Sequence, residues 1–281
     1  MKYPSEADRG PASAPGKRLR TLLLPLAVGA LLLAVLTLMA AETWKDYKST
    51  LINSQTQQME LVVQSISDSI RFSLEEYTDR LDAAAGKLRE NPSQPLNLSR
   101  SDSITDLWVE DAEGNIVYSR YGVRLVCDVL LTQDGKISYW QYHQGDHHYL
   151  VLKEPVDDRA VCLVVDSEAV YDQLVSDIHV GTNGYIVIKT ADNRIVMHPE
   201  PAQWGIDILE GRRKLYQQYK LDMSSLAELL ATQLTQPSGI MTYYSYWWTD
   251  PDLPRVQKIS AFRKLELGNS FWTVSAVVDY D

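Results

Sequence analysis

Three of the five histidines lie close together and have a spacing that could bind a metal. His143 and His147 flank residues 144–146 (QGD), and His148 follows directly. Across a β-hairpin the two flanking imidazoles would approach each other, and Asp146 would add an oxygen ligand. Structural zinc, however, usually has four ligands with Cys among them, and the sequence has no C-x-x-C or H-E-x-x-H. The pattern therefore favours a solvated hairpin tip, and we expect no metal or other cofactor.

Signatures of catalysis are missing from the rest of the sequence. It contains no G-x-S-x-G, no phosphate-binding glycine loop and no Cys/His pair in a recognisable context. Acidic pairs such as Asp157-Asp158 are typical of turns. The net charge of −10 at pH 7 argues against nucleic-acid binding, which needs a basic surface. We therefore expect neither an enzyme in this chain nor a nucleic-acid partner.

The two cysteines, Cys127 and Cys162, both lie in apolar, strand-like runs. Buried free thiols are the simpler interpretation. One disulfide between them is the alternative, because an extracytoplasmic location would permit it.

The most hydrophobic stretch runs from Leu22 to Ala41 and contains no charged side chain. A helix of that length covers about 30 Å, the thickness of a bilayer's hydrocarbon core. A signal peptide has a shorter apolar region of roughly 7–15 residues, so we expect an uncleaved transmembrane helix over residues 21–41. Basic residues crowd the segment just before it, so the positive-inside rule places residues 1–20 in the cytoplasm as a short tail. Residues 42–281 are then extracytoplasmic.

Residues 42–92 predict a long stalk helix. Apolar or small residues recur at steps of three or four, the period of one helix face, namely Met59, Val63, Ile66, Ile70, Leu74, Tyr77, Leu81, Ala84 and Leu88. No proline occurs between Leu26 and Asn91, and Asn91-Pro92 predicts the helix end. Two compatible interpretations stay open: the stripe packs on the helix's own domain, or the stalk pairs two chains in a homodimer.

Beyond a polar segment, residues 93–103, the apolar period changes to two, which indicates β-strands. Strands are expected at 104–110, 115–119, 124–131, 136–143, 147–154, 159–165, 185–189, 195–199, 239–248, 256–265 and 271–280, and helices at 167–178 and 223–234. The fold class is therefore α+β: a transmembrane helix, a stalk helix, and two antiparallel-sheet modules in tandem. Residues 93–178 form the distal module and residues 179–281 the proximal module.

Residues 181–199 (GTNGYIVIKTADNRIVMHP) resemble the G-x-x-G-Y…D…H-P signature of Cache sensor domains. Residues 271–281 (FWTVSAVVDYD) are similar to the last strand of the same family. With the span, the long helix and the two sheet modules, residues 42–281 resemble a double Cache arrangement, in which two PAS-like modules lie on one long helix.

The resemblance implies an extracytoplasmic small-molecule-sensing region of a bacterial transmembrane signalling receptor. A histidine kinase is the first candidate output, with a diguanylate cyclase or a chemoreceptor as the others. Such receptors continue into a second span and an output domain, so we expect a fragment that stops at Asp281, although a single anchor is the alternative. A different class of function also stays open, namely a membrane-anchored extracellular interaction module that binds no small molecule.

PAS-like modules hold ligands in a concave pocket lined by aromatic side chains and a few polar groups. In the distal module the candidates are Tyr118, Arg120, Tyr121, Trp140, Tyr142 and Asp166. Family members that bind amino acids use such residue types, so Arg120 would bind a carboxylate and Asp166 an ammonium group. The spacing departs from the family motif, because no Tyr is followed by Arg-x-Trp. The alternative is that the aromatics are core residues and Asp166 caps a helix.

A second candidate pocket lies in the proximal module and consists of His198, Trp204, Tyr244, Tyr246, Trp248 and Lys258. Residues 243–248 (YYSYWW) are the densest aromatic run. On a strand Tyr244, Tyr246 and Trp248 would share one face. One face packs into the core, and the other lines a pocket or a dimer contact. A purely structural role is the alternative for His198.

Overall fold

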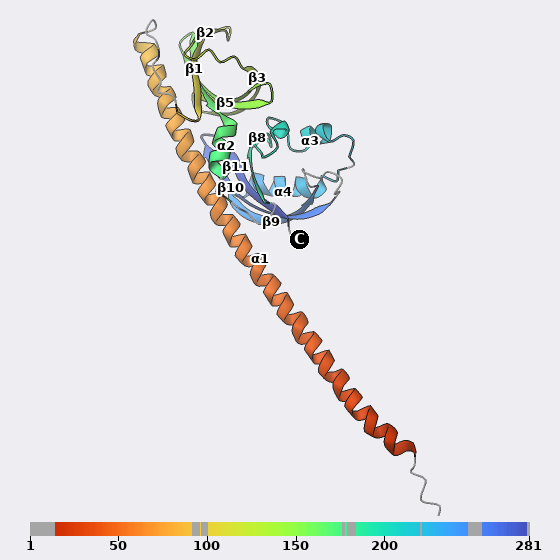
Figure 1. Cartoon of the computed structure of the whole chain (residues 1–281). Coiled ribbons are helices and arrows are strands. Elements are labelled where there is room, and N and C mark those ends of the chain that lie inside the picture. Colours follow the sequence, from red (N-terminus) through yellow and green to blue (C-terminus); the bar gives the residue numbers. More distant parts are fainter. Residues whose placement is uncertain are drawn as a thin grey trace, which may run out of the picture. The chain divides into compact units, whose positions relative to one another are not determined.

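The computed structural model describes residues 15–91, 96, 101–175, 178, 184–219, 221–246 and 255–279, with side chains from residue 26 onwards. The chain divides into two compact units, residues 1–54 and 55–281. Within the described residues the fold is α+β, as the sequence predicts: one long helix precedes two antiparallel sheets (Figure 1).

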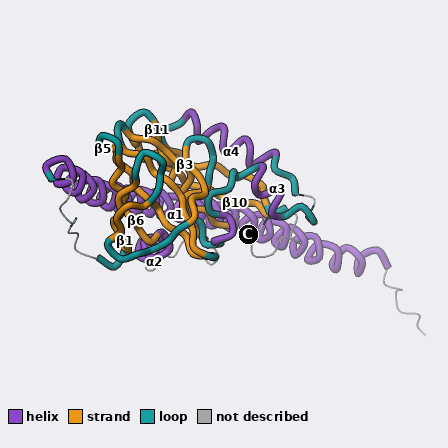
Figure 2. The backbone as a smooth tube through the Cα atoms, turned by 90° about the horizontal axis from the view of Figure 1, so that it is seen from above, coloured by secondary structure: helices purple, strands orange, loops and turns teal. Residues whose placement is uncertain are grey.

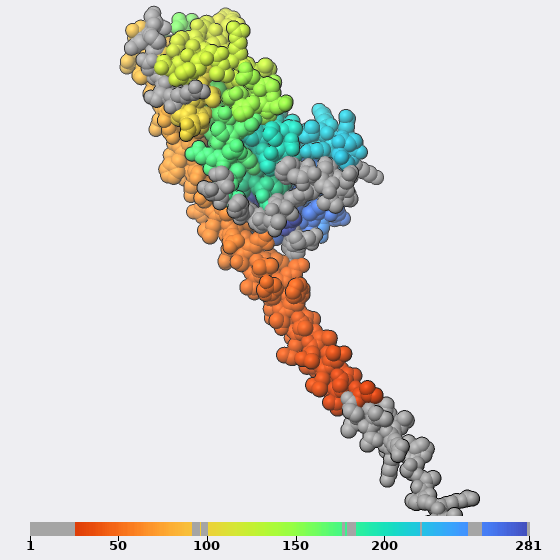
Figure 3. All heavy atoms as spheres, in the orientation of Figure 1, coloured from red at the N-terminus to blue at the C-terminus, as the bar shows by residue number. Residues whose placement is uncertain are grey.

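The first unit consists of the N-terminal part of helix α1, which spans Pro15–Glu90. From Leu26 to Leu51 every side chain is exposed, and many of them are apolar. The orange-red spheres of this segment in Figure 3 form a thin rod one helix wide. The Thr37 hydroxyl donates to the carbonyl of Ala34 at 2.8 Å. This polar side chain is therefore satisfied inside the apolar helix. Among the described residues this is the one helix that is long and apolar enough to cross a membrane.

The rest of α1 belongs to the second unit and packs on it. Every residue of the predicted stripe from Met59 to Leu88 is buried, with an exposed fraction of 7% or less. This confirms that one helix face is buried in the chain's own fold. Polar contacts fix the same face: the Tyr77 hydroxyl donates to Ser103 Oγ at 2.9 Å. The helix ends at Glu90, just before Asn91 and Pro92, as expected.

The first sheet of the second unit has six antiparallel strands in the order β2-β1-β6-β5-β4-β3. Some of these strands are labelled in Figures 1 and 2. They are β1 (Ile104–Glu110), β2 (Ile116–Ser119), β3 (Val126–Asp134), β4 (Ile137–Gln144), β5 (His147–Val156) and β6 (Arg159–Asp166), followed by helix α2 (Ser167–Val175). Glu154 of β5 is fully buried and receives a 2.6 Å ion pair from Arg89 of α1. One face of this sheet therefore lies against α1, and the other points away from it.

The second sheet has five antiparallel strands in the order β8-β7-β11-β10-β9. Its elements are β7 (Tyr185–Thr190), β8 (Ile195–Met197), the 3₁₀ turn η1 (Pro201–Gln203), α3 (Glu210–Leu215), α4 (Ser224–Thr235), β9 (Ser238–Ser245), β10 (Val256–Leu267) and β11 (Ser270–Asp279). Leu226, Leu229 and Leu230 of α4 pack on one sheet face, against Tyr243 and Phe262. This module thus has a helical cover on the face that carries those residues.

Two features differ from the sequence-based expectations. Between the expected strand at 195–199 and the expected helix at 223–234, the structure contains η1 and α3, which are too short to show a helical period. Both cysteines are free, but only Cys162 is buried, while Cys127 is exposed. They lie on β6 and β3, which are separated by β5 and β4. At the usual strand separation this places them about 14 Å apart along the sheet. That separation is too large for the alternative disulfide.

Candidate functional site

The covered face of the second sheet carries polar side chains where a core would normally be apolar. The strand register places Lys258 of β10 opposite Tyr243 of β9, and Ser260 opposite Val277 of β11. Tyr185 of β7 lies opposite Val277 in turn. Because directly paired residues share a face, these side chains all point toward the cover formed by η1, α3 and α4.

Arg212 of α3 reaches down from the cover and is 7% exposed. Its Nε donates to Gln203 Oε1 at 2.8 Å, and Gln203 Nε2 donates to the Tyr216 hydroxyl at 3.1 Å. The Tyr216 ring lies 5.3 Å from that of Tyr246, measured between centroids. This chain of contacts ties the cover to the end of β9 and holds a guanidinium group inside the module.

Lys258 is 2% exposed and points into the same interior. Its Nζ donates to the carbonyl of Tyr246 at 2.6 Å and lies 5.7 Å from the Tyr185 ring centroid. The second contact is at a cation–π distance. Burial lowers the pKa of Lys258 to about 7, with a further contribution from the charge of Arg212, while Asp279 acts in the opposite direction. The amine can therefore gain or lose a proton near neutral pH.

His198 completes the group at the end of β8 and is 1% exposed. Its Nδ1 accepts a hydrogen bond from the backbone N–H of Glu200 at 2.9 Å, and its ring lies 5.3 Å from that of Tyr185. Burial, followed by the charges of Arg212 and Lys258, holds the pKa of His198 well below its usual value. The imidazole is therefore neutral at physiological pH.

A small cavity of about 20 Å³ lies between the sheet face and α4. Its volume suits about one water molecule. Polar residues on the wall are Tyr185, Lys189, Arg212, Gln233, Tyr243, Ser260 and Ser275. Gln233 Nε2 donates to Ser275 Oγ at 3.1 Å, but Gln233 Oε1 and Ser260 Oγ have no hydrogen-bond partner among the described residues. Buried polar atoms without partners are uncommon in folded proteins, so this interior is equipped to bind a polar group.

The second candidate pocket from the sequence is only partly assembled here. Tyr246, Lys258 and His198 lie in the interior cluster. Trp204 is buried as well, and its Nε1 donates to the carbonyl of His198 at 2.6 Å. Tyr244 is on the other side of β9, under the guanidinium of Arg255 at 4.3 Å from the ring centroid. Its predicted face-sharing with Tyr246 is wrong, because β9 ends at Ser245 and the alternation of strand side chains ends there. Trp248 lies outside the described residues.

The six distal candidates do not form one site. Trp140, Tyr142 and Asp166 share the sheet face that also carries Trp108 and points away from α1. Tyr118 and Arg120 point to the opposite face, where both donate to the carbonyl of Leu96, at 3.2 and 3.3 Å. The reason is the strand period of two: β2 is paired so that Tyr118 lies opposite Val109, not opposite Trp108.

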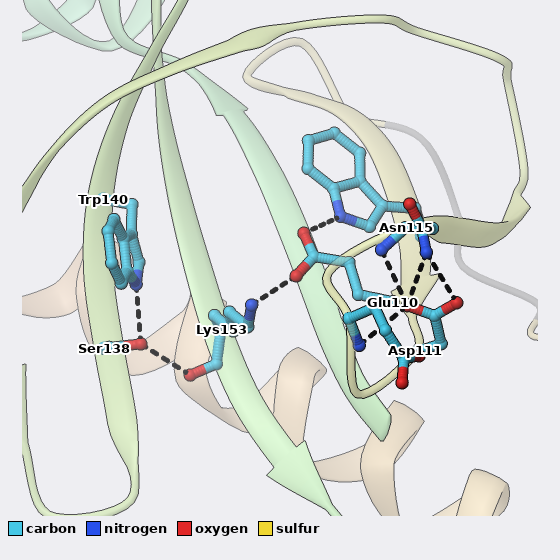
Figure 4. Close-up of polar contacts among 8 residues, drawn as sticks. Glu110, Asp111, Asn115, Ser138, Trp140 and Lys153 are labelled. Carbon is cyan, nitrogen blue, oxygen red and sulfur yellow. Dashed lines mark hydrogen bonds and ion pairs between the residues drawn. The ribbon is translucent and has the colours of Figure 1, made fainter. Parts of the chain in front are cut away.

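Three of the distal candidates, Tyr121, Asp166 and Trp140, have structural partners. Tyr121 is exposed, and the guanidinium of Arg120 lies 5.5 Å from its ring centroid. Asp166 Oδ1 accepts a hydrogen bond from the N–H of Ala169 at 3.0 Å, so Asp166 caps helix α2, the alternative to a ligand-binding role. On the same face Trp140 Nε1 donates to Ser138 Oγ at 2.8 Å (Figure 4).

Figure 4 also shows an ion pair between Lys153 of β5 and Glu110 of β1. Trp108 Nε1 donates to the same carboxylate at 2.9 Å. The contact spans β6, which lies between the two strands. The ion pair and the Trp108 hydrogen bond therefore give these three polar side chains partners within the sheet face itself. Residues 120–125, which connect β2 to β3, contain no helix that could cover this face.

The three hairpin histidines have carboxylate or aromatic neighbours. His143 Nδ1 lies 2.5 Å from Asp128, and His147 lies 3.0 Å from Asp166. His148 stacks on Trp204 at 5.3 Å between ring centroids, which joins the two sheets. Among the described residues no group of three or more possible ligands could hold a metal ion. His143 and His148 instead line a cleft of about 880 Å³ between residues 128–148 and 194–206.

Sequence reasoning missed Arg212, Gln203, Tyr185 and Gln233. Arg212 stands beside Arg213 in the run Glu210–Leu215, and nothing in the sequence separates the buried arginine from its exposed neighbour. Gln203 and Gln233 have no motif. Only Tyr185 could have been found, since it belongs to the G-x-x-G-Y segment.

No model of a known protein family matches the sequence, and no curated protein matches it. Solved structures do. The ligand-binding domain of the Pseudomonas fluorescens chemoreceptor CtaA in complex with L-serine has a TM-score of 0.52 at 13% identity, over 84% of this chain and 98% of that one. The ligand-binding domain of the Pseudomonas aeruginosa amino acid chemoreceptor PctB with L-Arg has a TM-score of 0.50 at 12% identity, over 84% and 96%.

The extracellular domain assigned to the histidine kinase rpHK1S-Z16 is similar to the same extent, with a TM-score of 0.50 at 15% identity, over 80% of this chain and 95% of that one. These structures are extracellular ligand-binding domains of the Cache type. The likeness is one of fold, and it extends over both sheets of the second unit. The second unit therefore has the double Cache fold, two PAS-like antiparallel sheets that follow one long helix.

Proposed function

We propose that this chain is the extracytoplasmic small-molecule-sensing region of a membrane-bound signal-transduction receptor. The observation that carries the proposal is the interior of the proximal module, where Arg212 and unpartnered polar atoms line a covered cavity in a sensor fold, and Lys258 is buried on the same sheet face. Buried charged side chains and buried polar atoms without partners lower the stability of a folded protein unless a bound group interacts with them. A ligand would explain why this module contains them.

The apolar part of α1 anchors the protein, with residues 1–20 in the cytoplasm and residues 42–281 outside. The positions of Lys17, Arg18 and Arg20 support this orientation. The distal module comprises residues 93–178 and the proximal module residues 179–281. Similar structures are sensing domains and not catalysts, which agrees with the absence of catalytic motifs.

The proximal cavity, at about 20 Å³, does not have the volume to hold a metabolite. Ligand pockets are usually more than ten times larger. Ligand binding therefore requires the cover of η1 and α3 to move away from the sheet. A ligand that binds only the open arrangement shifts the equilibrium toward it. We propose that this shift passes to α1 and on to an output domain, with a histidine kinase as the first candidate and a chemoreceptor or diguanylate cyclase as the others. The receptor acts as a homodimer.

A thermal-unfolding screen of the full chain in lipid nanodiscs tests the proposal. The library contains amino acids, organic acids, sugars, nucleosides and polyamines. A ligand present at 100 times its dissociation constant stabilises the folded state by about 2.7 kcal/mol, a shift of several degrees for a domain of this size. We expect a hit whose shift is lost in Arg212→Gln and kept in Arg213→Gln, the exposed neighbour on α3.

The same hits are measured in Trp140→Ala. If that variant loses the shift and Arg212→Gln keeps it, the ligand binds the distal module and the proposed location is wrong. If no compound in the library shifts the melting temperature, the sensing proposal itself fails. The interaction-module alternative would then be the better description.

A further inference from the structure

Three basic side chains enter the proximal interior from three separate elements. Lys189 comes from β7, Arg212 from α3 and Lys258 from β10, and they are 1%, 7% and 2% exposed. Placing several positive charges in a low-dielectric interior is costly unless negative charge accompanies them. A core of ordinary composition would have avoided this arrangement.

Negative charge of the protein itself is scarce in this interior. Among the described residues the buried acidic side chains are Asp106, Glu110 and Glu154, and all three belong to the first sheet. None of the residues that line the proximal cavity is acidic. The acidic groups that act on the cluster are Asp192 on Lys189, Asp279 on Lys258 and Glu200 on Tyr216; Asp192 is exposed and the other two are half-buried. The Lys189 ammonium itself donates to the neutral amide oxygen of Asn193 at 2.9 Å.

Hydrogen-bond donors, by contrast, are available. Within the described part of the chain the Arg212 guanidinium uses only its Nε, toward Gln203. Its two terminal nitrogens can therefore form the fork that suits a carboxylate. Ser260 Oγ lacks a partner among the same residues and can donate as well. The burial that lowers the pKa of Lys189 to about 8 and that of Lys258 to about 7 would be partly offset by a bound anion.

A ligand with an ammonium group would find no comparable partners in this interior. It would enter beside Lys258 and Arg212 without a buried carboxylate to accept its hydrogen bonds, and like charges at such range repel. We infer that the ligand of the proximal module is a small organic anion without an ammonium group, whose carboxylate is bound by Arg212, Lys258 and Ser260. This inference rests on the proposed sensing function and names the chemical class of its ligand.

Matched pairs of compounds test the inference on the full chain in nanodiscs. Isothermal titration compares propionate with alanine and succinate with aspartate, pairs that differ by one ammonium group. Propionamide is the uncharged control. We expect the amine-free anion of a pair to bind at least about tenfold more tightly than its amino acid, and propionamide to show no binding.

Variants separate the role of the guanidinium from the fold. Arg212→Gln should weaken anion binding about 10- to 100-fold, which corresponds to roughly 1.4–2.8 kcal/mol. Arg212→Lys should retain part of it, and Arg213→Gln all of it. Unfolding midpoints in the absence of compound show whether each variant is folded, and Ser260→Ala provides a milder test at a second contact.

The outcomes test the anion inference separately from the proposed sensing function. Tighter binding of alanine and aspartate than of propionate and succinate would overturn the anion inference and leave sensing in place. Binding of the anions unchanged in both Arg212→Gln and Ser260→Ala would overturn the location. Binding of none of these compounds, together with hits elsewhere in the library of the thermal screen, would refute the anion class alone.

Discussion

Lys258 offers the sharpest test of the charged interior, because its substitution can be studied without any ligand. The side chain is 2% exposed on β10, and its ammonium donates to the Tyr246 carbonyl at 2.6 Å. Lys258→Met keeps most of the aliphatic stem and removes the charge. If the buried charge is costly, its removal should stabilise the fold at acidic and neutral pH.

The size of the effect follows from proton linkage. Burial, aided by Arg212, lowers the pKa of Lys258 in the folded state to about 7 from 10.5. Below pH 7 the lysine is charged in both states, and its full cost is present. Between pH 7 and 10.5 the unfolded chain binds a proton that the folded chain does not, so wild-type stability rises with pH by up to about 1.4 kcal/mol per pH unit. Above pH 10.5 the cost is gone.

The gain from Lys258→Met is therefore largest at pH 6 and smaller at pH 9. The hydrogen bond to Tyr246 contributes about 1 kcal/mol in the opposite direction. We expect a net stabilisation of about 2–3 kcal/mol at pH 6, and little or none at pH 9. Lys189, whose pKa burial lowers to about 8, stays in both proteins and cancels in the difference.

Urea denaturation of the full chain in nanodiscs, followed by tryptophan fluorescence, measures both free energies of unfolding. Lys264→Met is the matched control: the residue lies on the same strand but is only half-buried, and its ammonium donates to the Leu234 carbonyl at 2.9 Å and lies 4.1 Å from the Phe271 ring centroid. It should change stability by less than about 0.5 kcal/mol at either pH. A gain for Lys258→Met that is equal at pH 6 and pH 9, or a loss at both, would refute the reasoning.

Three further predictions concern the rest of the chain. Glu154→Gln should lower the free energy of unfolding by about 1–3 kcal/mol in urea denaturation, because Arg89 and Lys136 lose their buried carboxylate partner. Asp158→Asn, at an exposed turn, should leave the free energy of unfolding unchanged. In native protein an alkylating reagent should label Cys127, while Cys162 should react only after unfolding, since burial raises the pKa of its thiol and removes it from solvent; equal labelling would contradict the burial. Single cysteines placed along residues 42–60 should crosslink with a helical period if the stalk pairs in parallel, and crosslinking without a period would count against that pairing.

Much of the fold could be predicted because its elements are long and periodic. The buried stripe of α1 repeats without interruption from Met59 to Leu88, and the strands have clear breaks between them. Pro92 and the hairpin turns mark the ends. Local sequence carries this information, since each element's own period decides whether it can bury one face.

The site was harder to predict, because it depends on the register between paired strands and on the short helix that covers the second sheet. Tyr118 and Trp140 both have suitable chemistry, but the pairing of β2 with β1 places Tyr118 on the other sheet face. Tyr244 and Tyr246 would share a face only if β9 continued past Ser245. Arg212 is buried only because the short helix α3 lies over the sheet. Such features come from long-range contacts, which the period of a single segment does not contain.

The position of the charged cluster also explains how a ligand in the proximal module could affect α1. Strand β10 carries Lys258 and Ser260 on the cavity side, while Ile259 and Ala261, both buried, alternate to the other side. Residues of α1 between Glu60 and Gln64 line a cavity of about 230 Å³ with the start of β9 and the middle of β10, so helix and sheet adjoin there. One layer of strands therefore separates the cluster from the helix. If the proposed anion draws in Lys258, it acts on a strand whose middle also adjoins α1.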